Sequence, residues 1–210
     1  FLYKFGVVLQ HCDQPAEALQ RFSAALELTP THLPSLEAAF PRFNENGNWE
    51  RVRATGREIL RLRGGAGAAD EMARLYVQLG TAELELGNAA GALKNFKKAL
   101  EKSSNDVAAL EGLARVHKAA CDWNSLLSTY NSIIKYAREP GQVIAAYMTK
   151  GDVLDRELNY TDKAVLHFEK VLMYDKTNFG AAARLGQIAI DRGDLELATS
   201  FAEKARGSAR

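Results

Sequence analysis

The feature that most constrains the fold is a residue pattern that recurs along the chain. It consists of a glycine, an alanine twelve residues later, an aromatic four residues further, a small residue three beyond that, and then a leucine. The clearest copy is Gly80, Ala92, Phe96, Ala99 and Leu100. Offsets of three and four place side chains on one face of an α-helix, so each copy predicts a helix whose apolar face carries small residues and one aromatic.

The chain contains six copies of this pattern, four good and two degenerate. They are centred on Gly6, Phe40, Gly80, Ala114, Gly151 and Gly186. The copy at Gly151 has one extra residue in its turn. The copy at Phe40 has Gly56 where the aromatic is expected and Pro41 inside its first helix. Because an interior proline costs about 3 kcal/mol or kinks a helix, we expect this copy to be distorted.

Equivalent positions are 34 or 35 residues apart, except across two longer gaps of 40 and 37 residues. These gaps contain Gly64-Gly65-Ala66-Gly67 and Glu139-Pro140-Gly141, which are strong loop signals. We therefore predict copies 1 and 2 in residues 1–63, a flexible Gly/Ala-rich joint in 64–72, copies 3 and 4 in 73–138, a loop in 139–143, and copies 5 and 6 in 144–210.

The predicted helix ends agree with six helix-turn-helix copies and no strands. A residue able to cap the second helix precedes it in every copy; the candidates are Asp13, Asn48, Asn88, Asp122, Thr161 and Asp194. Just before the cap, three copies carry a glycine (Gly47, Gly87 and Gly193), which suits a left-handed end of the first helix. Cys12 and Cys121 occupy the same slot in two others, so we interpret them as turn residues and not as a disulfide pair.

The order Leu79-Gly80, Gly87, Ala92, Phe96 and Ala99-Leu100 resembles the tetratricopeptide repeat, and the resemblance extends over essentially the whole chain. It implies an all-α fold, a right-handed solenoid of stacked helix pairs. It also implies a non-catalytic scaffold or adaptor, which binds a peptide or helix of a partner protein in a concave groove lined by the first helix of each pair.

The family register assigns the groove positions. They are Tyr3, Val7, Gln10, Glu37, Asn44, Arg74, Val77, Gln78, Thr81, Leu84, Glu111, Arg115, Lys118, Met148, Asp152, Asp155, Arg184, Gln187 and Ile190. Some members of the family clamp a C-terminal carboxylate with Lys and Asn at fixed groove positions. Here Tyr3 and Val7, or Val77 and Thr81, stand at those positions, so the resemblance does not extend to such a clamp.

The charged groove positions leave alternatives open. Arg115 and Lys118 lie on adjacent turns of one helix and could bind an acidic segment, or they could pair with Glu111 or face water. Asp152 and Asp155 could receive a basic residue of the partner. No histidine or nucleophile accompanies these carboxylates, so acid-base catalysis is not expected.

Composition excludes several other classes of function. Lys and Arg number 27 against 26 Asp and Glu, which gives no support to nucleic-acid binding. No apolar stretch reaches the roughly 20 residues that span a bilayer, so we expect a soluble protein without direct membrane insertion, with a cytoplasmic location favoured. The four histidines have no metal-ligand spacing, and neither a metal nor a cofactor is expected.

Two alternatives to a free-standing adaptor remain. The chain begins at Phe1 without an initiator methionine, which suggests the repeat arm of a larger enzyme or regulator. The second alternative is self-association through the face of the last helix. That face would consist of Leu195, Ala198, Phe201, Ala202 and Ala205.

Overall fold

The computed structural model describes residues 1–64 and 66–207, with side chains described up to Lys204. Gly65 in the predicted joint, residues 208–210 and the side chain of Ala205 lie outside the described part. The chain divides into two compact units, unit 1 (Phe1–Val116) and unit 2 (His117–Arg210). The boundary falls inside one helix, and each unit is described by itself.

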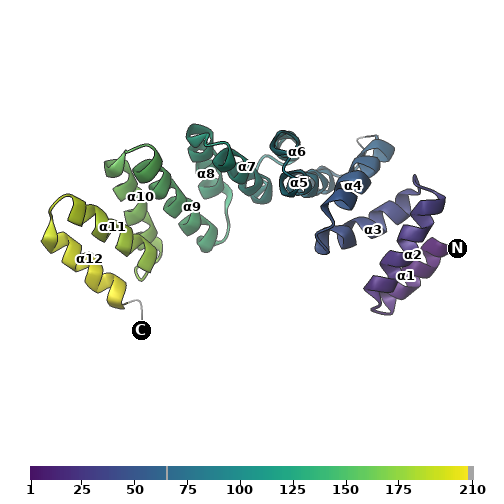
Figure 1. Ribbon diagram of the computed structural model, residues 1–210, viewed down its shortest axis with the longest axis horizontal. Helices are drawn as coiled ribbons and strands as arrows, with labels where there is room; N and C mark the ends of the chain where they lie inside the picture. The colour runs from purple at the N-terminus through teal and green to yellow at the C-terminus, as the bar shows by residue number, and fades with distance from the viewer. Residues whose placement is uncertain (65, 208–210) are drawn as a thin grey trace. The chain divides into compact units, whose positions relative to one another are not determined.

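The described residues form helices and no strands, which confirms the all-α prediction. Unit 1 holds α1 (Leu2–His11), α2 (Pro15–Leu28), α3 (Leu33–Glu45), α4 (Trp49–Arg63), α5 (Ala69–Glu85), α6 (Ala89–Lys102) and most of α7 (Val107–Ala119). Unit 2 continues with α8 (Trp123–Tyr136), α9 (Pro140–Asp152), the π-helix η1 (Val153–Glu157), α10 (Thr161–Tyr174), α11 (Phe179–Asp191) and α12 (Leu195–Gly207). Within each unit, consecutive helices pack as antiparallel pairs (Figure 1).

The recurring glycine and aromatic residue meet inside the helix pairs. A Cβ atom placed on Gly80 of α5 would lie 2.7 Å from Cε1 of Phe96 on α6. The same construction gives 2.6 Å between Gly6 and Phe22, and 2.4 Å between Gly151 and Phe168. Each phenylalanine is at most 1% exposed. The ring therefore occupies a socket that exists only because the first helix lacks a side chain at that position.

In the α3/α4 pair the positions of the aromatic residue and the glycine are exchanged between the two helices. Here the aromatic, Phe40, is on the first helix and the glycine, Gly56, is on the second. A Cβ on Gly56 would lie 2.9 Å from Phe40 Cε2 and 2.8 Å from Leu79 Cδ2 of α5. The helix also continues through Pro41 to Glu45. The expected distortion is thus an inverted socket and not a broken helix.

Four of the six predicted helix caps are confirmed. Asn48, Asn88, Asp122 and Asp194 each accept a hydrogen bond from the backbone N–H three residues later. The predictions for Asp13 and Thr161 are wrong, because α2 follows Gln14 with a proline in its first turn and α10 begins at Thr161 itself.

The left-handed turn position is also confirmed at the three glycines, which have φ between 65° and 78°. Cys121 adopts φ 52°, as predicted for that slot. Cys12 does not, since its φ is −84° and the left-handed residue is Asp13. Short polar side chains tolerate this backbone region better than most others do. Both cysteines are exposed and free.

The extra residue of the fifth copy is absorbed by η1. Its five residues follow α9 directly and wind wider than an α-helix. The chain then reaches Asn159, which takes the left-handed turn position with φ 55°. A π-helix accommodates a one-residue insertion without shifting the helices on either side. The Gly151–Phe168 socket is therefore preserved.

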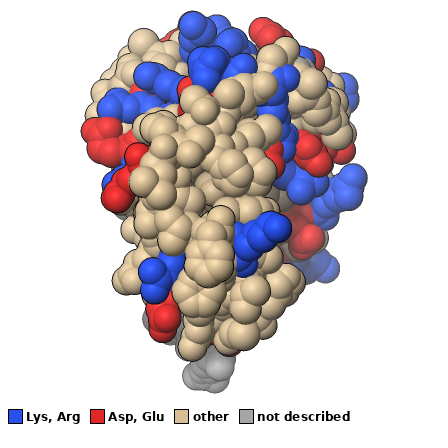
Figure 2. Space-filling view, turned by 90° about the vertical axis from the view of Figure 1, so that its right-hand side faces the viewer, with Lys and Arg blue, Asp and Glu red and all other residues tan. Residues whose placement is uncertain are grey.

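The two interruptions of the repeat are short. α4 ends at Gly64, whose φ is 57°, and α5 already begins at Ala69, inside the predicted joint of 64–72. Pro140 and Gly141 form the first turn of α9 instead of a loop. No helix in the described part of the chain combines the length and the apolarity needed to cross a membrane. Figure 2 faces the end that carries α1 and α2, and the middle of this face is uncharged.

Candidate functional site

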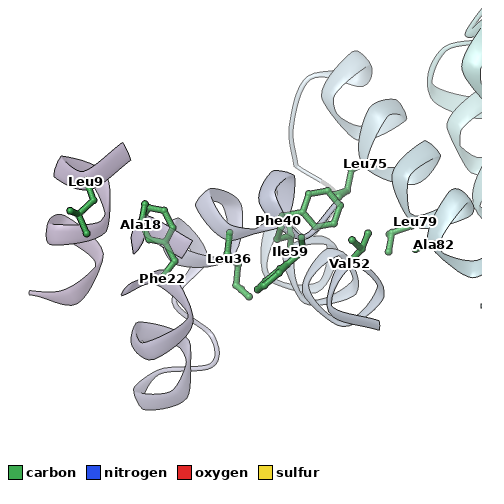
Figure 3. Packing of buried hydrophobic residues seen from close by; sticks show 12 residues of the cluster. Leu9, Ala18, Phe22, Leu36, Phe40, Val52, Ile59, Leu75, Leu79 and Ala82 are labelled. Atoms are coloured by element: carbon green, nitrogen blue, oxygen red, sulfur yellow. The ribbon is translucent and has the colours of Figure 1, made fainter. Parts of the chain in front are cut away.

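A hollow of about 200 Å³ lies in unit 1 among α3, α4 and α5. Three buried side chains, Phe40, Ile59 and Leu75, line it. They belong to the apolar core that runs from Leu9 on α1 to Ala82 on α5 (Figure 3). Its polar lining consists of Glu37, Arg63, Glu71, Arg74 and Gln78. The hollow thus combines an apolar lining with charged groups.

Most charges of this hollow neutralise one another. Arg63 of α4 donates through Nη2 and Nε to Glu37 Oε1 of α3, at 2.6 and 2.9 Å. Its Nη1 lies 3.4 Å from Glu71 Oε2 of α5. Arg74 is exposed, and no ion pair to it is found in residues 1–64 and 66–207. One cationic group therefore remains available at the edge of the hollow.

The hollow brings together three sequence-predicted groove residues of unit 1: Glu37, Arg74 and Gln78. Two other predicted positions are used inside the fold. Val77 packs against the core cluster of Ala92 and Phe96, and the Thr81 hydroxyl donates to the Val77 carbonyl oxygen at 3.0 Å. Arg63, Ile59 and Glu71 were not predicted, because second-helix and first-turn residues lie outside the family register of the groove.

Arg115 has a partner that the sequence did not suggest. Its guanidinium lies 2.7 Å from Glu85 Oε1, which joins α7 to α5, the preceding first helix of unit 1. Glu111 is exposed on the same helix. A residue that already makes an ion pair must lose that pair before it binds a partner's carboxylate. Arg115 is thus a weaker candidate than Arg74.

In unit 2, two predicted groove residues also form an ion pair with each other. Arg184 Nη2 of α11 lies 2.8 Å from Asp152 Oδ1 at the end of α9. Burial raises the pKa of Asp152, and the positive charges of Arg156 and Lys118 oppose that rise. Asp152 is thus already paired within the chain, and its binding of a partner's basic residue stays a prediction that would compete with Arg184.

The other predicted groove residues of unit 2 are largely engaged. Gln187 donates to Asp191 at 2.9 Å. Met148 packs against the core cluster of α9, α10 and α11, and a Cβ on Gly180 would lie 3.3 Å from its Cε. Asp155 is half-buried on η1 and Lys118 is exposed at the end of α7. Gln187 and Met148 are thus engaged within the fold, whereas Lys118 remains exposed.

A buried polar group between α8, α9 and α10 was missed by the sequence analysis. Lys150 is 8% exposed and donates to Asn131 Oδ1 of α8. Burial lowers the pKa of Lys150. His167 stacks on Tyr147 at 5.8 Å between ring centroids, and its buried Nδ1 has no hydrogen-bond partner.

Burial, together with the positive charge of Lys150, lowers the pKa of His167 to about 4. The signal for this group was available in the sequence, since Lys150 directly precedes the socket glycine, where other copies carry an apolar residue. Among the described residues, no group of three or more His, Cys, Asp or Glu side chains is arranged to hold a metal ion.

A second hollow, of about 360 Å³, is lined by residues of α11 and α12. Phe179 and Ile190 are 61% and 53% exposed there, and Ala183 and Ala202 are exposed as well. Gly186 lines the hollow, and a Cβ on it would meet nothing closer than Phe201 Cβ at 3.5 Å. This surface contains three residues of the predicted self-association face: Ala198, Phe201 and Ala202.

Comparison with known proteins identifies similar sequences and structures. The family model described as tetratricopeptide repeat matches residues 73–106 and 144–178, which contain most of the α5/α6 and α9/α10 pairs. A comparison with curated proteins gave no match. Many solved structures are similar.

Three solved structures illustrate the likeness. YrrB, a TPR protein with an unusual peptide-binding site, is 19% identical over 86% of this chain and 88% of its own, with a TM-score of 0.66. The MamA protein is 18% identical over 84% and 91%, with a TM-score of 0.69. A tetratricopeptide repeat protein from Parabacteroides merdae is 20% identical over 100% and 78%, with a TM-score of 0.55. Residues 73–106 and 144–178 are thus tetratricopeptide repeats, and the chain as a whole has the fold of tetratricopeptide repeat proteins.

Proposed function

We propose that this protein is a non-catalytic scaffold that holds a peptide segment of a partner protein, and that the hollow among α3, α4 and α5 is its main binding site. The fold is that of protein-interaction scaffolds in general. The observation that carries the finer proposal is the combination of an apolar lining with the exposed Arg74 at the same hollow. Binding sites typically combine such an apolar surface with a few polar groups that orient the ligand.

The charges of the hollow indicate which peptide fits. Glu37 and Glu71 share the single positive charge of Arg63, which offsets one of their two negative charges. Arg74 is left to bind a carboxylate, which a guanidinium can do with two hydrogen bonds. The favoured ligand is therefore a segment with an apolar side chain against Phe40 and Leu75 and an acidic residue close by. A buried anchor of this kind usually contributes most of the binding energy at an interface.

The peptide-binding site reported for YrrB supports the general mode of binding, since that protein has the same fold. At 19% identity the likeness concerns the fold, so the ligand chemistry proposed here rests on the residues of this chain alone. The Lys-and-Asn clamp for a C-terminal carboxylate is not part of the proposal. Arg74 would take an acidic side chain within the segment instead.

The test is a selection of peptides from a random library displayed on phage, carried out with purified wild type and with Arg74→Glu. The matched control is Arg138→Glu, which makes the same charge change at an exposed residue in the connection before α9. We expect wild type and the control to enrich segments with an acidic residue beside an apolar one, and Arg74→Glu to lose them. Equal enrichment by all three proteins, or no enriched peptide at all, would contradict the proposal.

We also propose self-association through the α11/α12 face as a second function. The exposed apolar hollow of about 360 Å³ is the observation that favours it. Exposed apolar surface that is continuous over several side chains commonly marks an interaction site. The measurement is the molar mass in solution over a wide concentration range, and a strictly monomeric mass would contradict this second proposal.

A further inference from the structure

The hollow among α3, α4 and α5 contains one more carboxylate than its internal ion pairs neutralise. Glu37 and Glu71 share Arg63, and a single guanidinium offsets only one of their two negative charges. Arg74, the other cation of the hollow, forms no ion pair within the described residues 1–64 and 66–207. The hollow therefore presents one negative charge to a ligand in addition to the positive charge of Arg74.

The distances and exposures show which carboxylate carries this charge. Glu37 Oε1 accepts hydrogen bonds from Arg63 Nη2 and Nε at 2.6 and 2.9 Å, whereas Arg63 Nη1 lies 3.4 Å from Glu71 Oε2. A hydrogen bond between a guanidinium and a carboxylate is normally about 2.7–2.9 Å long. The side chain of Glu71 is 59% exposed, compared with 38% for Glu37. Glu71 is therefore the carboxylate that remains available.

Arg63 is fixed on the side of Glu37. Its side chain is 25% exposed, and a Cβ on Gly67, in the turn before α5, would lie 3.6 Å from its Nη1. A move of Arg63 towards Glu71 would break two short hydrogen bonds and leave Glu37 without its partner, which costs free energy. The negative charge of Glu71 therefore persists until a ligand supplies a cation.

Glu71 and Arg74 lie on the same side of α5. They are three residues apart, and this spacing makes them neighbours on a helix surface, about 4.5 Å apart along the helix axis. Leu75, which is 6% exposed, follows directly and belongs to the apolar lining of the hollow (Figure 3). An extended peptide advances about 3.3 Å per residue, so charges up to three residues apart in one segment can reach both side chains.

We propose that the peptide held in this hollow carries a basic residue as well as an acidic one, and that Glu71 binds the basic side chain while Arg74 binds the acidic one. The inference rests on the peptide binding proposed above and defines its ligand more closely. The ligand is a segment with one apolar anchor and one residue of each charge.

The arrangement also determines which segments are rejected. A segment with several acidic residues and no basic one would bring its second carboxylate close to Glu71. Like charges at an interface are repulsive, and such a repulsive contact contributes to specificity as much as an attractive one does. Glu71 is therefore a specificity-determining residue that selects against acidic runs, although Arg74 by itself would attract them.

The test repeats the selection from the random phage-displayed library with Glu71→Lys. The matched control is Asp70→Lys, which makes the same charge change at the adjacent residue. Asp70 is also exposed and also lies in the first turn of α5, but it does not line the hollow. Because both variants remove an acidic residue from the same helix start, any effect on the helix itself is common to the two. Circular dichroism and thermal unfolding check that both keep their helices.

We expect wild type and Asp70→Lys to enrich segments with an acidic, an apolar and a basic residue close together. Glu71→Lys should keep the acidic residue that Arg74 binds and should replace the basic residue with a neutral or acidic one. The selection thus reports the two contacts separately, since each variant changes one charge of the ligand and leaves the other.

The affinities are then measured with a synthetic copy of the peptide that wild type enriches most, by fluorescence anisotropy at low ionic strength. We expect Glu71→Lys to bind it about tenfold more weakly than wild type, and Asp70→Lys within about twofold of wild type. Replacing the basic residue of the peptide with glutamine should weaken binding to wild type about threefold and should not weaken binding to Glu71→Lys. Added salt should reduce all of these differences.

Three results overturn the inference and leave the binding function intact. The first is that wild type enriches acidic and apolar residues without a basic one, and the second is that Glu71→Lys still enriches the basic residue. The third is that Asp70→Lys changes the selected peptides as much as Glu71→Lys does, which would show a general charge effect and no contact. If wild type enriches no peptide at all, the proposed function fails, and the inference fails with it.

Discussion

The α5/α6 and α3/α4 pairs solve the same packing problem with opposite residues. In α5/α6 the first helix supplies Gly80 and the second supplies Phe96. In α3/α4 the first helix supplies Phe40 and the second supplies Gly56. In both pairs one ring fills the space left by one missing side chain. The packing of a helix pair therefore depends on the combined volume of the two side chains at the crossing. It does not depend on which helix carries the larger one.

The two pairs nevertheless differ in what the ring contacts outside its own pair. Phe96 lies against α7 as well, where a Cβ on Gly112 would be 2.3 Å from its ring. In the inverted pair the glycine makes the outer contact, because Leu79 of α5 approaches Gly56. Phe96 thus contacts three helices, α5, α6 and α7, through its ring. In the inverted pair, Phe40 of α3 and Leu79 of α5 both pack into the space that Gly56 of α4 leaves. This difference predicts which substitutions each pair tolerates.

The largest effect is expected for Phe96→Ala. The side chain is 1% exposed and fills sockets on both sides, so its removal leaves a cavity that neighbouring helices cannot close without moving. We expect a loss of about 3–5 kcal/mol in the free energy of unfolding. Urea unfolding followed by circular dichroism measures it, and a loss below about 1 kcal/mol would mean that the ring is not a shared anchor.

The next largest effect is expected for Gly56→Ala in the inverted pair. A methyl group there would lie 2.8 Å from Leu79 and 2.9 Å from Phe40, which requires at least two side chains to shift. We expect a net loss of about 1–2 kcal/mol, in spite of the better helix propensity of alanine.

Gly141→Ala in the first turn of α9 is the matched control for this change. A Cβ there meets nothing within 4 Å, and the same substitution should be neutral or stabilising by up to about 1 kcal/mol. Equal effects of the two alanines on the urea midpoint would show that propensity, and not packing, governs the inverted pair.

The glycine–phenylalanine socket could be predicted from the sequence, but the ion pairs between helices could not. Glycine and phenylalanine recur because few other residue pairs fit a close helix crossing. Their regular spacing can therefore be recognised in a single sequence. Ion pairs such as Arg115–Glu85 and Arg184–Asp152 join different helices. Many charged side chains could reach one another across a helix crossing, and only the packed structure selects the partner. Groove polarity was therefore less predictable than the fold.

The inverted pair is also tied to α5 by a buried charge. Glu83 of α5 is fully buried and accepts hydrogen bonds from Arg57 of α4 at 2.5 Å and from Asn88 at 2.7 Å. Arg57→Ala leaves the carboxylate with one partner, and we expect a loss of about 1–2 kcal/mol in urea unfolding.

Arg61→Ala, four residues along the same helix, breaks an exposed pair with Glu58. It should cost well under 1 kcal/mol in the same measurement. If both alanine variants cost the same, the Arg57–Glu83 bond adds nothing specific to the junction between α4 and α5.

The smallest effect concerns the α9/α10 pair, which has the regular socket but places titratable residues beside it. Lys150 precedes Gly151, and His167 precedes Phe168. The pKa of His167 lies at about 4, below its ordinary value of 6.5, so the folded state favours the neutral ring. As pH falls below about 6.5, the unfolded chain takes up the proton first, and stability is lost until about pH 4.

Because the ring is partly solvated, we expect only about 1 kcal/mol of this loss between pH 7 and pH 5. His167→Phe, which also removes the unpartnered Nδ1, should abolish that part of the pH dependence. The same slope of unfolding free energy against pH in wild type and variant would mean that His167 is protonated in the folded state at pH 5.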